Sequence, residues 1–513
     1  MYKLLLLLLL FNCGIVAAQQ DAKALKYATA ISENALKEKL SILASAEMEG
    51  RETASPGQKK AAAYIENQFK RMGLTPGNGN GYQQYYPVYR DSIATKTIAV
   101  NGRDFSWDKD FSVSLRGLTS GIFSFQSVVF VGYGIVDTIN KINDFEGLEV
   151  KGKVALILEG TPMGYTAPPV SGRRAMSTTS TNAKIANARK AGAVAVFVVT
   201  NDFPKKVPGI TKSDMYLKPT PAANFSVSVS AQLAAALIGN TAEPTFEALK
   251  GIKKGEYTTK LTINISKITE TLESSNVIGI LPGTDKKDEY VFITGHYDHL
   301  GKRGNVIYYG ADDDGSGTVG VMQMAEAFMN AAKNGDQPRR TIVFMTVSGE
   351  EKGLWGSDYY SEHPLFPLEK TSVDLNTDMI GRVDTERNLA DSLNYIYVIG
   401  HDKLSSELPV INESVNKLYT NLTLDYKYDD PKDPNQIYYR SDHYNFAKKG
   451  VPVLFFYDGM LLADYHQPTD TVDKINFELM AKRAKLVFHT AWVMANKNDM
   501  LKRDTPLNMP SSR

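Results

Sequence analysis

The chain contains 513 residues, of which 43% are hydrophobic and 22% are charged, and its 58 Lys and Arg nearly balance its 57 Asp and Glu. This length allows more than one hydrophobic core, since single domains usually stop growing near about 250–300 residues. The balanced charge gives no basic footprint for nucleic acid, and the single Cys excludes an internal disulfide and a thiolate metal site. Any bound metal must therefore be held by His, Asp and Glu.

Residues 1–18 have the pattern of a secretory signal peptide. A Lys, an apolar run over residues 4–11 and a small-residue stretch ending at Ala18 follow one another. We expect cleavage after Ala18, which removes Cys13 and leaves a secreted or periplasmic chain with no membrane span. The alternative is a lipid anchor on Cys13, although the two residues before it are bulky and polar where small ones are usual.

Residues 19–119 begin with two expected helices. The first covers residues 23–43. The second starts at Ser55, where Ser-Pro-Gly-Gln supplies an N-cap hydroxyl, Pro at the first helical position and Gln three residues after the cap, and it ends at Gly73. From residue 88 to 125, short alternating runs punctuated by Gly indicate strands.

Residues 120–270 form a distinct tract that is rich in β-branched runs. These runs lie at residues 127–131, 154–158, 194–199 and 225–229. One helix is expected between them, at residues 182–191. Because no cluster of titratable side chains stands out, we expect a β-rich insert with a structural or lid role, not a second active site.

Residues 271–500 alternate between strand and helix patterns, and residues 501–513 form a tail. Strands are expected at residues 290–294, 341–347, 372–377, 395–399 and 451–457, and helices at residues 318–332, 354–360, 442–449 and 477–496. This alternation predicts an α/β fold with a mixed, mostly parallel sheet flanked by helices. Ligands of such sheets bind beyond the carboxyl ends of the strands.

Side chains of the metal-binding type follow these strands. They are His296 and Asp298 in GHYDH, Asp312, Asp313 and Asp314 in GADDDGSG, Glu350 and Glu351 in SGEEKG, Asp378 in NTDMIG, and His466 in DYHQPTD. Each motif alone has an ordinary explanation, because Asp before a helix is commonly an N-cap and a Glu pair is usually solvated. Their coincidence at one edge of one sheet favours a shared site.

The residue types suit a pair of divalent ions. Two ions about 3.5–4 Å apart need a bridging carboxylate, terminal ligands and an open position for water. Imidazole and carboxylate ligands without thiolate favour two zinc ions, with manganese or cobalt possible. Glu350 beside Glu351 suggests that one carboxylate is a ligand and the other a general base.

These motifs, in order and spacing from Asn276 to about Asn496, resemble the co-catalytic di-zinc aminopeptidases, whose relatives include glutamate carboxypeptidase, the transferrin receptor ectodomain and glutaminyl cyclase. The resemblance implies a phosphorylase/hydrolase-like zinc exopeptidase fold. The tract at 120–270, with VFVGYGI, VKGKVALILEG and ANARKAGAVAVFVV, looks like the protease-associated domain often inserted in such enzymes. The resemblance therefore implies a peptidase domain split into residues 19–119 and 271–500.

The resemblance also implies roles for single residues. His296, Asp313 and Asp378 would hold one metal, and Asp313, Glu351 and His466 the other, with Asp313 bridging. Glu350 would be the general acid and base. Asp298 would fix the His296 ring, and the Tyr465 phenol would stabilise the oxyanion, although a packing role for Tyr465 is an alternative.

His299 stands where many members of this family have a small residue. We expect it to be structural, with an extra metal contact as the less favoured alternative. The sequence Ser441-Asp442-His443 is not read as a serine-hydrolase triad, because a triad needs spatial, not sequential, adjacency.

The expected function is a secreted metallo-aminopeptidase acting on peptides or proteins with free N-termini. A carboxypeptidase or dipeptidase of the same fold is the main alternative, with Arg382 and Arg440 as candidates for binding a substrate carboxylate. A glutaminyl cyclase and a non-enzymatic, receptor-like protein are weaker alternatives.

Overall fold

The computed structural model describes residues 20–115, 118–169, 176–208, 210–219, 225–240, 242–388 and 390–509. The expected signal peptide and Cys13 lie outside these residues. Contacts divide the chain into two compact units: unit 1 takes the residues up to Pro87 and from Glu273 onward, and unit 2 takes Val88–Leu272. Residues 88–119, which the sequence pattern placed with the N-terminal segment, have their contacts within unit 2.

Unit 1 begins with two short helices where the sequence predicted one over residues 23–43. Helix α1 covers Ala22–Ala28 and α2 covers Glu33–Leu43. The single long helix was wrong because Ser32 starts a new helix, its hydroxyl accepting a hydrogen bond from the Ala35 amide at 3.3 Å.

Helix α3 covers Pro56–Met72 and confirms the start and stop signals. The Ser55 hydroxyl accepts from the Gln58 amide at 3.2 Å, and Gly73 ends the helix in a left-handed conformation. The Gln58 side-chain oxygen accepts from the amide of Ala54, the residue before the cap, at 3.2 Å. The Gln58 Nε2 donates to the Tyr297 hydroxyl, which ties the helix to the loop after the central strand.

The sheet of unit 1 is mixed and mostly parallel, as predicted. Its strand order is β18 (Thr423–Asp425), β17 (Tyr395–Ile399), β19 (Val453–Tyr457), β16 (Thr371–Thr377), β12 (Lys286–His296), β15 (Arg340–Val347) and the end of β11 (Gly255–Leu281). The four strands from β19 to β15 are parallel, whereas β17 against β19 and β11 against β15 are antiparallel. Four further strand segments belong to unit 1: β1 (Thr75–Pro76), the start of β2 (Gln83–Val100), β13 (Lys302–Arg303) and β14 (Val306–Ile307).

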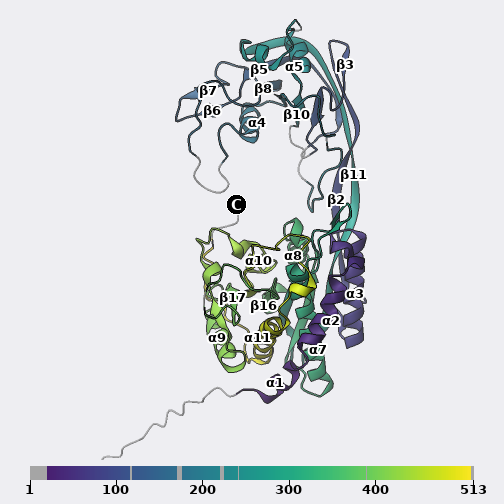
Figure 1. The fold of residues 1–513 in the computed structure, drawn as a ribbon, viewed down its shortest axis with the longest axis vertical. Coiled ribbons are helices and arrows are strands. Elements are labelled where there is room, and N and C mark those ends of the chain that lie inside the picture. Colours follow the sequence, from purple (N-terminus) through teal and green to yellow (C-terminus); the bar gives the residue numbers. More distant parts are fainter. Residues whose placement is uncertain are drawn as a thin grey trace, which may run out of the picture. The chain divides into compact units, whose positions relative to one another are not determined.

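Helices cover both faces of this sheet (Figure 1). One face packs on α1, α2, α3, α7 (Gly317–Lys333), α9 (Glu407–Tyr419) and α11 (Phe477–Asn496). The other face packs on α8 (Trp355–Glu362) and α10 (His443–Ala447). Strand β15 divides its side chains accordingly, with Ile342 and Phe344 in the first core and Val343 and Met345 in the second. Because both faces are covered, the strands read as continuous apolar runs.

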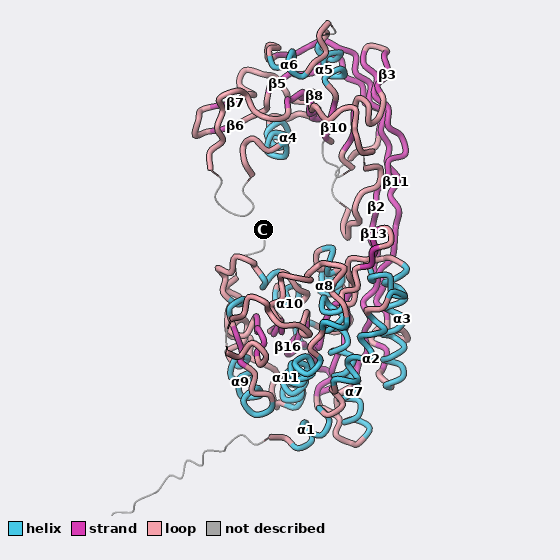
Figure 2. Tube along the Cα trace, in the orientation of Figure 1, coloured by secondary structure: helices cyan, strands magenta, loops and turns pink. Residues whose placement is uncertain are grey.

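Unit 2 is built mainly from strands and loops (Figure 2). Strands β5 (Gly121–Gly132), β8 (Val154–Leu158), β9 (Ala195–Val199) and β10 (Ser226–Val229) are parallel neighbours in that order, and β4 (Phe111–Val113) and the first part of β11 are antiparallel additions. The remaining elements are β3 (Arg103–Phe105), β6 (Val136–Asp137), β7 (Ile142–Asn143), α4 (Thr181–Lys190), α5 (Ala231–Ile238) and α6 (Phe246–Lys250). Of the helices in the described part of the chain, none has the length and hydrophobicity needed to cross a bilayer.

Candidate functional site

The carboxyl ends of three parallel strands bring the predicted residues to one edge of the unit 1 sheet. Strand β12 ends at His296, directly beside the last residue of β15, and β16 ends one residue before Asp378. Glu350 and Glu351 follow β15 after a two-residue turn. Because the strands are parallel and in register, residues that are far apart in sequence become neighbours at this edge.

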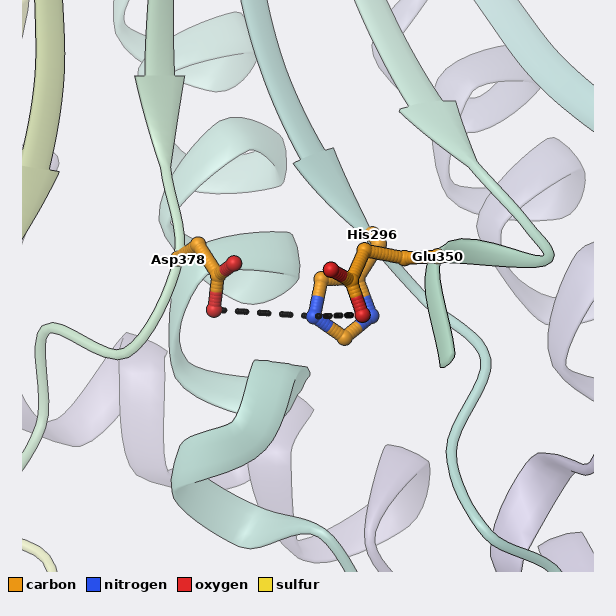
Figure 3. Close-up of side chains that lie close together, drawn as sticks. All are labelled: His296, Glu350 and Asp378. Atoms are coloured by element: carbon orange, nitrogen blue, oxygen red, sulfur yellow. Dashed lines mark ion pairs between the residues drawn. The ribbon is translucent and has the colours of Figure 1, made fainter. Parts of the chain in front are cut away.

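His296 is the centre of the first group of side chains. Its Nε2 lies 3.2 Å from Asp313 Oδ1, 3.5 Å from Asp378 Oδ1 and 3.8 Å from Glu350 Oε2. Figure 3 shows the Asp378 and Glu350 carboxylates converging on this imidazole beyond the ends of the strands. The ring is fully buried, so these contacts take place away from bulk water.

His466 approaches the same aspartate from the other side. Its Nε2 lies 3.1 Å from Asp313 Oδ2 and 3.0 Å from Glu351 Oε2. The two oxygens of Asp313 thus face two different histidines. The structure therefore brings together all five residues that the resemblance implied as metal ligands.

His299 joins this second group, which the sequence interpretation did not favour. Its ring is fully buried, and Nδ1 lies 2.7 Å from Glu351 Oε1 and 4.0 Å from Asp313 Oδ2. The sequence offered one signal for this role, the position of His299 three residues after His296 in the same loop. A spacing in a loop does not predict the direction in which a side chain points, so the ring could not be placed.

Two buried aspartates fix the loops that carry these side chains. Asp298 accepts hydrogen bonds from the Thr53 hydroxyl at 2.7 Å and from the Glu350 amide at 3.2 Å. Asp314 accepts from the amides of His296 at 3.0 Å and Met379 at 2.9 Å. The peptide bond between Asp313 and Asp314 is cis. Asp298 accordingly anchors the Glu350 backbone as well as lying beside the His296 ring.

Arg51 is a second support that sequence reasoning missed. Its guanidinium is fully buried and donates to four backbone carbonyls: those of Leu43, Tyr297, Tyr309 and Gly310. Tyr297 lies between His296 and Asp298, and Gly310 precedes the Asp312–Asp314 run. One side chain from the N-terminal segment therefore holds two of the loops at the site.

The charges at the site shift one another's ionisation in the metal-free chain. Burial lowers the pKa of His296, but Asp378 and Glu350 outweigh burial and raise it well above its usual range. Burial likewise lowers the pKa of His466, whereas hydrogen bonds to Asp313 and Glu351 raise it to about 10. Burial raises the pKa of Glu350 well above that of an ordinary glutamate. Protons thus occupy His296 and His466 when no cation does.

Unsatisfied polar atoms show that these residues fit a metal. Within the described residues, the atoms that are buried and lack a hydrogen-bond partner include His296 Nε2, His299 Nδ1 and Nε2, Asp313 Oδ2 and Glu351 Oε1. Buried polar atoms are rarely left unpaired, and each costs about 1–3 kcal/mol when it is. Imidazole nitrogens and carboxylate oxygens that converge in this way are the donor set that zinc prefers.

A small recess adjoins the first group. Its lining residues are Asp313, Glu350, Asp378, Met379, Ile437, Arg440, Phe455, Tyr457, Leu461 and Tyr465. The Tyr465 hydroxyl accepts a hydrogen bond from Arg440 Nη2 at 2.8 Å, and its ring stacks on His466 at 3.9 Å between centroids. Arg382, by contrast, is paired with Asp464 at 2.8 Å. Of the two arginines considered as carboxylate binders, Arg440 is the one that lines the recess.

A third cluster of His401, Asp402 and Asp429 lies elsewhere in unit 1. The Lys403 ammonium sits between the two aspartates, at 2.6 Å from Asp402 and 2.7 Å from Asp429. Because a lysine already supplies the positive charge there, this cluster is an ion-pair network.

A model of peptidase family M28 matches residues 276–491, which carry the whole ligand cluster. Over this segment the chain is similar to peptidase family M28. The family expected from the motifs is thereby confirmed.

A probable leucine aminopeptidase from Arthroderma otae is 30% identical over 237 residues, which make up 45% of this chain and 61% of that protein. A probable zinc metalloprotease from Pyrenophora tritici-repentis is 34% identical over 152 residues, 28% of this chain and 29% of that protein. The chain thus spans less than two thirds of the length of these M28 relatives.

Two solved structures share the fold of this chain. The aminopeptidase from Aneurinibacillus sp. strain AM-1 gives a TM-score of 0.51 at 21% identity and covers 95% of this chain and 99% of its own. BSAP, a zinc aminopeptidase from Bacillus subtilis, gives a TM-score of 0.50 at 21% identity and covers 93% of this chain and 99% of its own. Both likenesses agree with the mixed α/β fold.

The buried carboxyl of Asp374, beneath the site, generates a prediction about stability. Burial raises the pKa of Asp374 to about 8, and the carboxyl accepts a hydrogen bond from the Thr294 hydroxyl at 2.8 Å. An acid whose pKa is raised on folding stabilises the native state fully below its unfolded pKa of about 4, and this stabilisation is lost as the pH rises to about 8. We expect Asp374→Asn to flatten the fall in unfolding free energy over this interval, measured by urea unfolding of the metal-free chain.

The matched control is Asp288→Asn, at an exposed position in the same unit. It should reproduce the pH profile of the wild type. An Asp374→Asn profile parallel to that of the wild type would contradict the assignment of this proton to Asp374.

Proposed function

We propose that this chain is a metallo-aminopeptidase that hydrolyses N-terminal peptide bonds with the help of two metal ions and a glutamate base. The observation that carries the proposal is the position of Asp313, whose Oδ1 lies 3.2 Å from His296 Nε2 and whose Oδ2 lies 3.1 Å from His466 Nε2. A carboxylate contacted on both oxygens in this way is the bridge that a two-ion site needs. The names of the M28 relatives support the same activity.

His296, Asp313 and Asp378 would hold the first ion, and Asp313, Glu351 and His466 the second. Zinc suits this set of imidazoles and carboxylates, with manganese or cobalt as alternatives. When bound, the two ions supply the Lewis acidity that makes water a nucleophile near neutral pH. The histidine protons of the metal-free chain leave on loading, since a ligand imidazole must be neutral.

Glu350 is the general base of the proposed mechanism. Its side chain lines the recess, and its backbone amide is fixed by Asp298 at 3.2 Å. Burial raises its pKa, which brings the carboxyl closer to the range where it both accepts and returns a proton. Glu350 takes the proton of the attacking water and delivers it to the leaving amine.

Tyr465 is placed to stabilise the developing oxyanion. Its hydroxyl oxygen already accepts a hydrogen bond from Arg440, so the phenol proton is free to point into the recess. Burial raises the pKa of Tyr465, so that this proton stays on the oxygen during turnover. The stacked His466 ring fixes the orientation of the phenol.

The choice between a free amine and a free carboxylate depends on Arg440, because the three carboxylates that line the recess, those of Asp313, Glu350 and Asp378, are the proposed ligands and base. Arg440 is the residue that supports the carboxypeptidase or dipeptidase alternative, but its guanidinium already donates to Tyr465.

The substrate test compares a free aminoacyl anilide or peptide with its N-acetylated counterpart. We expect hydrolysis of the free amine only, loss of that activity after treatment with a chelator, and its recovery on adding zinc. Activity that persists after complete metal removal would contradict the mechanism. Preference for an acetylated substrate with a free carboxylate would favour the carboxypeptidase, pyroglutamate formation would favour the cyclase, and a purified chain without metal would favour a non-enzymatic protein.

Glu350→Gln separates the base from the ligands. The amide keeps the shape of the side chain but cannot accept the proton, so we expect kcat to fall by about 10²- to 10⁴-fold while the metal content stays at the wild-type level. Metal content is measured by elemental analysis of the same samples as the kinetics.

The control for this substitution is Glu369→Gln, at an exposed position of the same unit, which should leave kcat unchanged. A wild-type kcat in Glu350→Gln would remove Glu350 from the mechanism.

We further propose that the chain is exported by a cleaved N-terminal signal. The apolar run at residues 4–11 and the small residues ending at Ala18 support this. Mass spectrometry of the chain recovered from the native host should give a mature N-terminus at Gln19. An N-terminus at Cys13 with added lipid mass would show the lipid-anchored alternative instead.

A further inference from the structure

The histidine that the five-ligand scheme does not use, His299, is held rigidly at the site. Its side chain is fully buried, and its amide donates to the Arg51 carbonyl at 3.2 Å. The ring lies against Gly310, where a Cβ atom would come within 2.5 Å of the His299 Cγ. Backbone and packing therefore fix the ring plane, so the direction in which Nδ1 points is set by the fold.

The two nitrogens of this ring make no hydrogen bond to any described residue. Nδ1 nevertheless lies 2.7 Å from Glu351 Oε1, and that oxygen also lacks a hydrogen-bond partner in the described part of the chain. A proton on Nδ1 makes this contact an ion pair, and a metal ion bound by both atoms would replace that proton. In either state the two atoms are held around a positive charge.

The distances match those between ligands of one ion. Atoms that bind zinc at about 2.0–2.2 Å lie about 3 to 3.5 Å apart. His466 Nε2 is 3.0 Å from Glu351 Oε2 and 3.1 Å from Asp313 Oδ2. The separations of His299 Nδ1 from Glu351 Oε1, 2.7 Å, and from Asp313 Oδ2, 4.0 Å, bracket the same range.

We propose that His299 Nδ1 is an additional ligand of the second metal ion, which four side chains then hold: His299, Asp313, Glu351 and His466. This inference rests on the proposed two-metal function and goes beyond its ligand set. It makes the two positions unequal. A position with four protein side chains is expected to bind its ion more tightly than the first position, which has three. The second position is therefore the tighter of the two.

Two neighbours of His299 fit this role. Its ring meets the His466 ring edge to face, with centroids 5.9 Å apart, so both imidazoles approach the position from different directions. Asp470 accepts hydrogen bonds from the amides of Asp312 and Asp313. It thereby holds the bridging aspartate in place without occupying either of its oxygens.

The direct test uses the full-length chain labelled with ¹⁵N-histidine and loaded with ¹¹³Cd, in which a ligand nitrogen shows a coupling to the metal. We expect coupled signals from His296 and His466, and a further one from Nδ1 of His299. His299→Gln should remove that signal and leave the other two. The matched control is His489→Gln, because His489 is also buried with an unpartnered Nδ1, yet stacks on Tyr419 away from the carboxylates. That variant should retain every coupling of the wild type.

Zinc titration against a competing chelator gives the second readout. We expect His299→Gln to weaken the tighter of two binding steps by more than about 100-fold, beyond the about 10- to 100-fold typical of a side chain that only orients a ligand. Couplings from His296 and His466 without one from His299 in the wild type would overturn this inference and leave the proposed function intact. Absence of all couplings would overturn the metal centre itself. The wild-type spectrum decides between these outcomes even if the His299→Gln variant fails to fold.

Discussion

The position of one carboxylate determines the layout of this site. One oxygen of Asp313 lies 3.2 Å from His296 and the other lies 3.1 Å from His466. Both halves of the cluster therefore contact this one carboxylate. The aspartate does not hold that position by itself. Its amide is bound by Asp470, and the next residue, Asp314, is bound by the amides of His296 and Met379. The loops after β12 and β16 and the start of α7 are thus arranged around a single side chain.

This arrangement requires many acidic groups in the interior, and the fold balances them mainly with backbone dipoles. Asp298, Asp314 and Asp470 each accept hydrogen bonds from backbone amides at the site. Such hydrogen bonds fix the direction of the carboxyl groups. His296 Nε2 and both ring nitrogens of His299 have no hydrogen-bond partner in the described structure. The supporting aspartates are thus bound by backbone amides, whereas these ring nitrogens are left to face a cation.

The sheet could be predicted from sequence because its strands appear as apolar runs at regular intervals. Most of the cluster could be predicted because its residues directly follow these runs. Apolar runs such as Thr341–Val347 mark buried parallel strands, and parallel strands place their following residues at one edge. Prediction failed where packing decides. Ser32 divides the first helical pattern, and α9, which has Pro409 in its first turn, was not expected. Arg51 bonds to carbonyls, which carry no side-chain signature, and the direction of the His299 ring depends on its contact with Gly310.

The buried Arg51 also shows that the structural unit around the site extends beyond the segment matched by the family model. Its guanidinium joins Leu43 to Tyr297, Tyr309 and Gly310, which are separated from it by more than 240 positions in the chain. The segment that matches the family model, residues 276–491, contains all the proposed ligands but not this arginine. Ribosomal synthesis must therefore complete all of unit 2 before the N-terminal segment meets the loops that it braces. Assembly of the site therefore depends on contacts between residues far apart in sequence and comes late in synthesis. A fragment that contains only residues 276–491 lacks the Arg51 guanidinium that binds its loops.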